Sequence, residues 1–266
     1  MAINSSPITC GPEILLWDVE TSKMLIEGAT YSLRQFSKRL PSEWIKRPVW
    51  MHCAAWKWFG KEAIGSTSVL KDKERFKADY SDDYHVVKTL YNLMLDADII
   101  VAHNGDNFDT KILNARLLYH GFNPLPKILS IDTLKLARRR FRIESNQLRY
   151  LARYLGVAQK DESPKWDLVA HGCPEEIKNS ERYCRQDIRA LEGVYKKLAP
   201  WNESAPNMNA FHAQDHDVCS KPECGHWDLE HRGYRTTKAG KYKRYQCKAC
   251  GGWSQGKKNL IKVNMR

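Results

Sequence analysis

The chain has 266 residues, 42% of them hydrophobic, enough to bury one large core beside a small second domain. The sequence has no apolar run of about 18 residues, and its N-terminus lacks a basic region followed by an apolar one, so we expect neither a transmembrane helix nor a secretory signal. A cytoplasmic location is expected.

The net charge of +12 is uneven, because residues from His216 onward carry 12 Lys and Arg against 4 Asp and Glu. This basic segment favours a polyanionic partner, most simply nucleic acid, with a solubility effect as the alternative.

Strand and helix patterns alternate along residues 13–200 after an initial run of strands. Apolar and β-branched runs predict strands at 13–19, 49–60, 63–70, 98–103 and the start of 128–141. Helical spacing of apolar residues predicts helices at 82–97, 108–121, the rest of 128–141, 145–156 and 174–200, the last divided into two. Short connections between the first strands favour antiparallel pairing. We expect an α/β fold with a mixed sheet flanked by helices.

Residues with helix-terminal preferences mark several boundaries. The expected caps and stops are Ser81 or Asp82 before 82–97, Gly121 after 108–121, Asp132 before a helix that begins near Thr133, Ser145 and Gly156 around 145–156, and Pro174 in a first turn. A turn at 59–61 is expected to join the strands 49–60 and 63–70.

Two acids follow the first apolar strand, in the stretch LLWDVET (15–21). Residues i and i+2 of a strand point to one face, so the carboxylates of Asp18 and Glu20 project together. Two hard oxygen ligands at this spacing suit one divalent cation. Taken alone, the pattern fits a solvated surface equally well.

Two later stretches add acids from other elements. HNGDNFD (103–109) follows a buried strand and opens a helix, which places Asp109 at or near the helix start, with Phe108 expected to anchor the turn in the core. A capping role for the aspartate is the alternative. In YCRQD (183–187), Tyr183 and Asp187 are four residues apart on a helix and share a face, although an ordinary amphipathic helix would look the same.

The order D-x-E, N-x3-F-D, Y-x3-D resembles the DEDD exonuclease superfamily, which has a ribonuclease-H-like fold and includes proofreading domains of DNA polymerases. Tyr183 is similar to the tyrosine of the DEDDy branch, whereas the branch with a histidine five residues before the last aspartate does not fit, because position 182 is Arg. The stretches AAWKWFG, IDTLKLARRRF, NQLRYLARYLG and KKLAPW are similar to phage and bacterial proteins of this type that end in a zinc ribbon. The resemblance implies a bacterial or phage-encoded protein.

This resemblance implies a chemistry for each acid. Two divalent ions, Mg²⁺ or Mn²⁺, would promote attack of water on a phosphodiester and stabilise the leaving 3′ oxygen. Asp18 would bridge both ions, Glu20 and Asp187 would complete the shell of the first, and Asp109 would support the second, largely through water. The extra acid Asp132 is assigned to the helix cap and left out of this set.

The remaining site residues are implied in the same way. Tyr183 would hold and orient the attacking water, because a phenol with an ordinary pKa near 10 is a poor general base. Thr21, Asn104 and Phe108 would contact the substrate or shape the site. Two basic stretches could contact nucleic acid. The stretch 21–48 has the interleaved aromatics Tyr31, Phe36 and Trp44, and its alternative is a plain structural insertion. The alternative for 137–142 is a solvated helix face.

The eight cysteines divide into two groups of four. Cys219 and Cys224 are separated by 22 residues from Cys247 and Cys250, and each pair ends in Cys-Gly. Four thiolates at this spacing predict a closed structural zinc site, with disulfides as the alternative in an oxidising compartment. The histidines His216, His226 and His231 are reserve ligands. The scattered cysteines are read as free thiols or small core residues: Cys10, Cys53, Cys173 and Cys184.

The organisation expected is an exonuclease domain over 1–200, a linker over 201–215 and a four-cysteine zinc ribbon over 216–266. In the ribbon, 232–246 is predicted to be a basic and aromatic hairpin that turns at Ala239–Gly240, similar to the zinc ribbons of some transposases. Nucleic-acid binding is its expected role and protein docking is the alternative.

The function expected is 3′–5′ hydrolysis of nucleic acid from a single strand or a frayed 3′ end, with DNA favoured and RNA as the alternative substrate. A polymerase or repair protein could act in trans, and the alternative is an inert binding protein.

Overall fold

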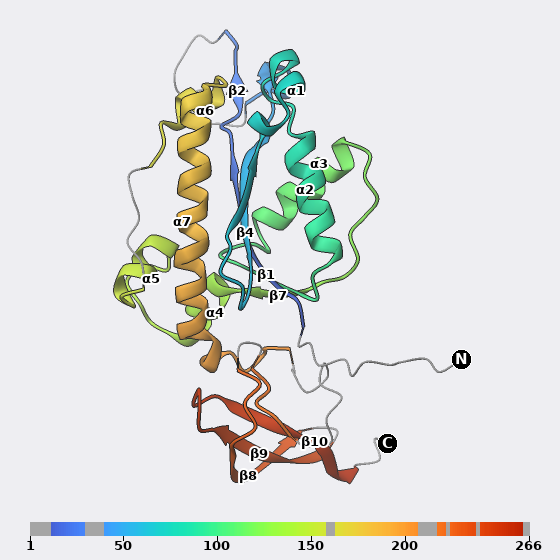
Figure 1. Ribbon diagram of the computed structural model, residues 1–266, viewed down its shortest axis with the longest axis vertical. Helices are drawn as coiled ribbons and strands as arrows, with labels where there is room; N and C mark the ends of the chain where they lie inside the picture. Colours follow the sequence, from blue (N-terminus) through green and yellow to red (C-terminus); the bar gives the residue numbers. More distant parts are fainter. Residues whose placement is uncertain are drawn as a thin grey trace, which may run out of the picture.

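A computed structural model describes residues 12–29, 40–157, 163–206, 217–221, 224–237 and 240–262. Its centre is a five-stranded sheet with the strand order β5-β4-β1-β6-β7 (Figure 1). The strands are β1 (Ile14–Thr21), β4 (Met51–Trp58), β5 (Gly65–Ser68), β6 (Ile99–Ala102) and β7 (Leu129–Asp132). β1 pairs antiparallel with β4 and parallel with β6, so the predicted mixed sheet is confirmed.

Helices cover both faces of this sheet (Figure 1). On one face lie α2 (Tyr84–Leu95) and α3 (Asp109–Tyr119), and on the other lies α7 (Pro174–Leu198). The shorter helices are α1 (Lys73–Ala78), α4 (Thr133–Arg140), α5 (Leu148–Tyr154) and α6 (Trp166–Ala170). α4 and α5 pack against the C-terminal half of α7 and form a second layer there.

The side chains of β1 alternate between the two cores. Leu15, Trp17 and Val19 are buried among the apolar residues of α2 and α3. Ile14 and Leu16 point the other way and are buried against α7. Because both faces are covered, the strand is apolar at every position up to Trp17, and the even-numbered residues that follow face α7.

α7 is one helix of 25 residues, so the predicted division of 174–200 into two helices is wrong. A continuous apolar stripe packs it on the sheet, and Pro174 stands in its first turn as expected. Gly193 does not break it. A Cβ added at Gly193 would lie 2.7 Å from Cβ of Val157, so glycine permits a close approach at this point.

Most of the predicted boundaries are confirmed. Asp132 caps α4 by accepting hydrogen bonds from the backbone N–H groups of Leu134 and Lys135 at 3.0 and 3.2 Å. Gly121 and Gly156 follow α3 and α5 with left-handed φ angles of 74° and 64°.

Two predicted N-termini differ from the structure. Helix α5 begins at Leu148 after Gln147, so Ser145 is not its N-cap. At α2 the N-cap is Asp83, while the carboxylate of Asp82 accepts from the N–H of Tyr84 at 3.0 Å. Asp83 itself makes no side-chain cap, because its carboxylate accepts hydrogen bonds from Met51, Arg116 and His120 instead.

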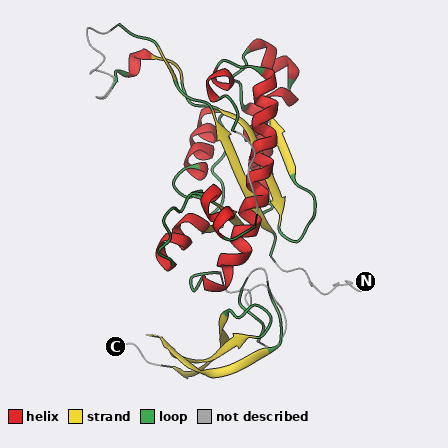
Figure 2. Cartoon of the chain, turned by 90° about the vertical axis from the view of Figure 1, so that its left-hand side faces the viewer, coloured by secondary structure: helices red, strands yellow, loops and turns green. Residues whose placement is uncertain are grey.

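The polar segment after β1 forms a short two-stranded arm, β2 (Leu25–Ile26) paired with β3 (Ile45–Arg47), which extends from the body of the molecule in Figure 2. The indole of Trp44 lies across Gly28, where an added Cβ would meet the ring at 2.1 Å. The aromatic residues Tyr31 and Phe36 lie outside the described residues.

A separate three-stranded sheet follows α7 in the chain; we call it the C-terminal sheet. Its strands are β8 (Leu229–Thr237), β9 (Gly240–Cys247) and β10 (Trp253–Lys262). The predicted hairpin over 232–246 is confirmed as β8 paired with β9, and β10 adds a third strand that was not predicted. Ala239 of the expected turn, most of the expected linker, His216 and Cys10 lie outside the described residues.

Within the described ranges, no helix has both the length and the apolar character needed to cross a membrane.

Candidate metal and nucleic-acid site

β1 presents two carboxylates to the helix that covers its face. Asp18 and Glu20 continue the row of Ile14 and Leu16, which pack against α7. β1 is the central strand; its first residues pair with both β4 and β6, whereas Asp18 and Glu20, beyond the pairing with β6, pair with Ala55 and Cys53 of β4.

Helix α7 supplies the third acid from the opposite side. Asp187 is buried on the sheet-facing side of the helix, with 7% of its surface exposed. One ligand oxygen from each of Asp18, Glu20 and Asp187 can be chosen so that all lie within 4.8 Å of one another. This group, the carboxylate cluster, brings together residues 169 positions apart and has the all-oxygen donor set that Mg²⁺ or Mn²⁺ prefers.

Asp109 lies next to the carboxylate cluster at the first position of α3. Its Oδ1 accepts a hydrogen bond from the backbone N–H of Val19 at 3.3 Å, which ties the start of α3 to the end of β1. Burial raises the pKa of Asp109 to about 7; the backbone hydrogen bonds oppose this effect and the charge of Asp132 adds to it. Asp109 is therefore placed beside the other acids although it is not within the group that could share one ion.

The acids repel one another. Burial raises the pKa of Asp18 well above its ordinary value, and the charges of Asp109, Asp187 and Glu20 raise it further. Four carboxylates at this density favour either protonation or a bound cation. A divalent ion is the simplest compensation, because it satisfies the lone pairs and the charge together.

Cys184 is a neighbour of Asp18 that the sequence did not predict; we expected only a free thiol or a small core residue there. Its Sγ donates to Oδ2 and to the backbone carbonyl of Asp18, at 3.4 and 3.5 Å. The thiol is fully buried between α7 and β1. It lies one helical turn before Asp187, and that spacing was the available signal that it faces the same strand.

Tyr183 lies one turn before Asp187 on α7, as its spacing predicted. It is half-buried, and its ring meets the indole of Trp166 edge-on, with centroids 5.9 Å apart and planes at 86°. The short helix α6 therefore fixes the ring of Tyr183 from outside the carboxylate cluster.

The loop after β6 has a different shape from that expected. Phe108 is 43% exposed, so the prediction that it anchors the turn in the core is wrong. Gly105 makes the close contact instead, because an added Cβ there would lie 2.4 Å from Cβ of Ala102. Asn104 has a φ angle of 70°, and its N–H donates to Oδ1 of Asp132 at 3.0 Å. Thr21, the last residue of β1, follows a register shift in its pairing with β4 and is half-buried.

We expect Asp132→Ala to destabilise the protein by about 1–2 kcal/mol, because α4 loses its cap and the strained Asn104 loses its hydrogen bond. Urea denaturation measures the change. Asp132→Asn, which retains an acceptor oxygen, is the matched control and should cost only a fraction of this. Equal destabilisation by the two variants would show that the charge of Asp132, rather than the cap, stabilises this loop.

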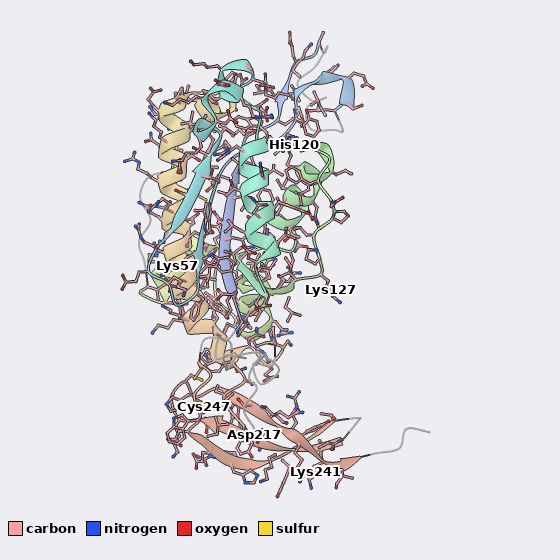
Figure 3. All side chains as sticks on the ribbon, turned by 45° about the vertical axis from the view of Figure 1, so that its right-hand side comes forward. Lys57, His120, Lys127, Asp217, Lys241 and Cys247 are labelled. Carbon is pink, nitrogen blue, oxygen red and sulfur yellow. The ribbon has the colours of Figure 1, made fainter. Side chains whose placement is uncertain are left out.

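The four C-terminal cysteines also come together. Cys219, Cys224, Cys247 and Cys250 offer sulfurs that all lie within 4.8 Å of one another. The sulfurs of Cys219 and Cys250, and those of Cys224 and Cys247, are 3.6 Å apart, too far for disulfide bonds. Figure 3 shows Cys247 at the end of the C-terminal sheet nearest the helices and Lys241 at the opposite end.

Backbone N–H groups point at these sulfurs. The N–H of Gly252 donates to Sγ of Cys250 at 3.4 Å, and those of Lys221 and His226 donate to the sulfurs of Cys219 and Cys224. Gly225 and Gly251 have left-handed φ angles of 56° and 71°, which turn the chain back after each pair. Amide donors around four convergent sulfurs fit thiolates bound to a tetrahedral Zn²⁺.

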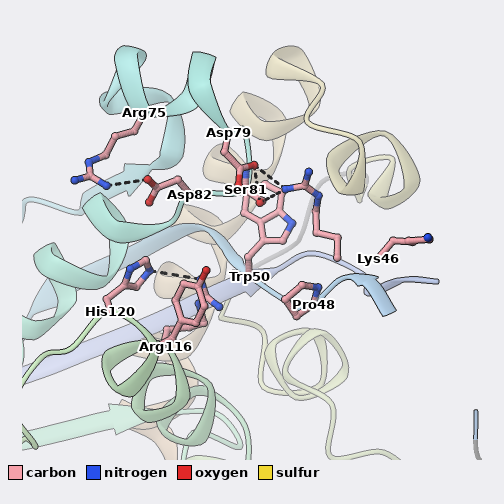
Figure 4. Close-up of a pocket in the computed structure, with 11 residues that line it drawn as sticks. Lys46, Pro48, Trp50, Arg75, Asp79, Ser81, Asp82, Arg116 and His120 are labelled. Carbon is pink, nitrogen blue, oxygen red and sulfur yellow. Dashed lines mark hydrogen bonds and ion pairs between the residues drawn. The ribbon is translucent and has the colours of Figure 1, made fainter. Parts of the chain in front are cut away.

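A second polar cluster lies on the opposite side of the sheet and was not predicted. The fully buried Asp83 accepts from Arg116 through two nitrogens, both at 2.7 Å, and from His120 at 2.6 Å. A cavity of 450 Å³ beside it is shown in Figure 4. The arginines Arg47 and Arg75 that line it are paired with Asp79 and Asp82. Asp83 also accepts from the N–H of Met51 in β4 at 2.9 Å, so we regard the cluster around Asp83 as an anchor between α2, α3 and β4.

A mixed sheet with helices on both faces, and acids on its central strand, corresponds to the ribonuclease-H-like fold. Residues 62–199 match the RNase_H superfamily, and the chain belongs to this superfamily. The matched range includes Asp109 and Asp187 and begins after Asp18 and Glu20.

Two proteins illustrate what the chain is similar to. A stretch of 70 residues is 43% identical to the DNA polymerase III PolC-type of Ureaplasma parvum serovar 3, and covers 26% of this chain and 5% of that polymerase. The family B DNA polymerase from the hyperthermophilic archaeon Pyrobaculum calidifontis superposes with a TM-score of 0.53 and 19% identity, over 71% of this chain and 25% of the polymerase chain. The second likeness concerns the fold alone. This chain spans only a small part of the length of either polymerase.

Proposed function

We propose that the protein is a metal-dependent 3′–5′ exonuclease of the DEDDy type that hydrolyses DNA. The observation that carries the proposal is the carboxylate cluster, with Asp109 beside it and Tyr183 one turn from Asp187. Membership of the RNase_H superfamily and the similarity to a DNA polymerase III PolC-type support a nuclease that acts on DNA. The order of the three motifs supports the DEDDy assignment.

The acids divide the work by position. Asp18, on which the charges of the other three acids act, is assigned to bridge two ions, and Glu20 and Asp187 would complete the site of the first. Asp109 is assigned to the second ion through water, consistent with its place outside the group of three. Two bound Mg²⁺ or Mn²⁺ ions would supply an activated water and stabilise the leaving 3′ oxygen.

Other residues orient the reactants. Cys184 restrains the Asp18 carboxylate by donating a hydrogen bond from its S–H to Oδ2. The exposed ring of Phe108 offers a surface for the terminal base, and Asn104 and Thr21 border the same end of the sheet as polar contacts. These three residues are proposed as substrate contacts.

Tyr183→Phe should lower kcat by between about 10-fold and about 100-fold and leave KM nearly unchanged, because it removes the hydroxyl that orients water and keeps the ring against Trp166. Steady-state kinetics on a single-stranded oligonucleotide measure both constants. Tyr84→Phe is the matched control, since Tyr84 packs against Phe122 on the other side of the sheet. A rise in KM alone would assign Tyr183 to substrate binding.

The direct test uses labelled oligonucleotides with Mg²⁺ or Mn²⁺. A 5′-labelled single strand of DNA should give a descending ladder, and a 3′-labelled one should release labelled mononucleotide first. Matched RNA strands identify an exoribonuclease, the alternative within this class. Binding of DNA without cleavage under either metal would contradict the enzyme and leave an inert recruitment protein.

We further propose that the four cysteines hold one structural Zn²⁺ and that the chain divides into an exonuclease domain (1–200), a linker (201–215) and a zinc ribbon (216–266). The amide donors around the sulfurs support the zinc site. The basic character of the C-terminal segment supports a role in holding nucleic acid. A polymerase or another replication or repair protein is the proposed partner in trans.

A further inference from the structure

The segment that follows α7 forms a junction between the two sheets. Lys221, only 3% exposed, donates from Nζ to the backbone carbonyl of Asn202 at 2.5 Å. Glu203, which follows Asn202 in the chain, forms an ion pair with Arg140 at the end of α4 at 2.5 Å. Residues 202–205 are therefore held on one side by α4 and on the other by Lys221, which lies between Cys219 and Cys224 ahead of the C-terminal sheet.

Two cavities meet at this segment. One, of 340 Å³, is lined by Asp132 and Asp106 at the end of the sheet, by Lys135 and Arg139 along α4, and by Asn202 and Ser204. The other, of 490 Å³, begins at Glu203 and Ala205 and continues over the C-terminal sheet. The first cavity starts at the loop that leads into Asp109, next to the carboxylate cluster: Asp106 of this loop lines the cavity, and Asp132, which also lines it, accepts a hydrogen bond from the N–H of Asn104 at 3.0 Å. Together the cavities border a path from that cluster to the C-terminal sheet.

The C-terminal sheet presents a basic and aromatic face to the second cavity. Arg244 is opposite Gln255 on the neighbouring strand, and Trp253 lies two residues before Gln255, so the three share a face. Arg235 joins them through its pairing with Tyr242, two residues from Arg244. Trp253 is 44% exposed, and the Arg244 guanidinium lies 5.1 Å from the centre of its ring. We call this face the ribbon groove.

We propose that the ribbon groove binds the single strand of nucleic acid on the 5′ side of the nucleotide being removed, with a base stacked on Trp253 and phosphates at Arg235 and Arg244. Aromatic faces stack any base, and arginines attract the backbone, so the recognition does not depend on sequence. This inference rests on the proposed function, which places the 3′ end at the carboxylate cluster.

The geometry sets a minimum length for the strand. From Asp187 to Leu198 the helix α7 rises by about 17 Å, which corresponds to about five nucleotides at a stacked spacing of 3.4 Å. The path continues beyond Leu198 through residues 202–205 before it reaches the groove. A strand of four nucleotides can therefore occupy the carboxylate cluster without touching Trp253, whereas a strand of 20 can occupy both.

The test is fluorescence anisotropy with the full-length chain and labelled single-stranded DNA, in a buffer without Mg²⁺, Mn²⁺ or chelator, so that the strand stays intact and bound zinc is retained. Trp253→Ala should weaken binding of the 20-nucleotide strand about tenfold and leave that of the four-nucleotide strand unchanged. Trp227→Ala is the matched control, because Trp227 is 71% exposed before β8 and does not line the cavity. Trp253→Phe, which keeps an aromatic face, should restore most of the affinity.

Arg235→Ala provides a second variant for the case in which Trp253→Ala fails to fold, as judged by its zinc content and circular dichroism. It should weaken binding of the long strand at low salt and reduce the slope of log affinity against log salt by about one. Equal effects of Trp253→Ala and Trp227→Ala, or equal effects on both strand lengths, would overturn the proposal. If the variants weaken binding but the protein cleaves nothing under Mg²⁺ or Mn²⁺, the groove stands and the proposed exonuclease activity fails.

Discussion

Asp18→Asn should slow release of nucleotides from a 3′ end by about 10³-fold or more while the fold stays intact. Asp18 is the acid assigned to bridge both ions, and its loss removes several kcal/mol of stabilisation of the developing charge, at about 1.4 kcal/mol for each tenfold. Single-turnover cleavage of a 5′-labelled strand measures the rate of the chemical step without product release.

The same substitution should not lower stability in the absence of metal. Burial and the charges of Asp109, Asp187 and Glu20 raise the pKa of Asp18, so an ionised carboxylate at this position costs folding energy. Asparagine has nearly the same shape and retains an acceptor oxygen for the S–H of Cys184. We expect a melting temperature equal to or above that of the wild type without metal, and loss of the further rise that Mg²⁺ or Mn²⁺ gives the wild type.

Asp96→Asn is the control for this prediction, since Asp96 is exposed at the C-terminus of α2 and takes no part in the carboxylate cluster. It should match the wild type in cleavage rate and in the response to metal. An Asp18→Asn protein that cleaves at the wild-type rate would remove the carboxylate cluster from the mechanism. One that is inactive and also unfolded would be replaced in the test by Asp187→Asn.

The fold was predictable where local pattern and tertiary environment agree. The strand 13–19 is apolar at the consecutive positions 14–17 because both faces of the sheet are covered, and that pattern predicted a strand there. The start of α3 at Asp109 and the cap at Asp132 followed from short-range chemistry that does not depend on the rest of the chain.

The differences arise where a tertiary contact decides the outcome. α7 continues through Gly193, where Val157 comes too close for any side chain larger than glycine, and no local signal in the sequence reports that contact. Phe108 was expected in the core because it is aromatic and follows a buried strand, yet Gly105 takes the close position on Ala102 and leaves the ring outside. Strand β10 was missed because its sequence, WSQGKKNLIK, lacks the alternation of a half-buried strand.

The candidate site shows the same division. The spacings placed Asp18 with Glu20 and Tyr183 with Asp187 on common faces, but they carry no information on which faces meet. That three motifs converge came from the family resemblance, and the 4.8 Å group of Asp18, Glu20 and Asp187 is consistent with it. Neither the spacings nor the family resemblance predicted the hydrogen bond from the S–H of Cys184 to Asp18, because it depends on the register of α7 over β1.

Cys247→Ser should abolish zinc binding, unfold the C-terminal sheet and leave the five-stranded sheet folded. Cys247 ends β9 and lies 3.6 Å, sulfur to sulfur, from Cys224, so one substitution opens a site on which both cysteine pairs depend. In a sheet this small, metal binding supplies about 10–16 kcal/mol at neutral pH, more than its core could replace. Zinc content by mass spectrometry and limited proteolysis of residues 217–262 are the measurements.

Cys173→Ser is the matched control, because Cys173 lies at the start of α7 outside the cysteine cluster. The two variants should also differ in their affinity for a long single strand at low salt: Cys247→Ser lowers this affinity, and Cys173→Ser does not. Unchanged binding by a zinc-free Cys247→Ser protein would assign the C-terminal sheet to protein docking instead.

Chelation separates the two proposed metal sites by their donor atoms. A chelator should remove ions from both, but added Mg²⁺ refills only the carboxylate cluster, because thiolates bind it poorly. The refilled protein should cleave a four-nucleotide strand at the wild-type rate and a 20-nucleotide strand with a raised KM, and Zn²⁺ should restore the latter. Loss of cleavage on both strands despite added Mg²⁺ would mean that the cysteine site supports the carboxylate cluster itself, and the two sheets would then have to act as one unit.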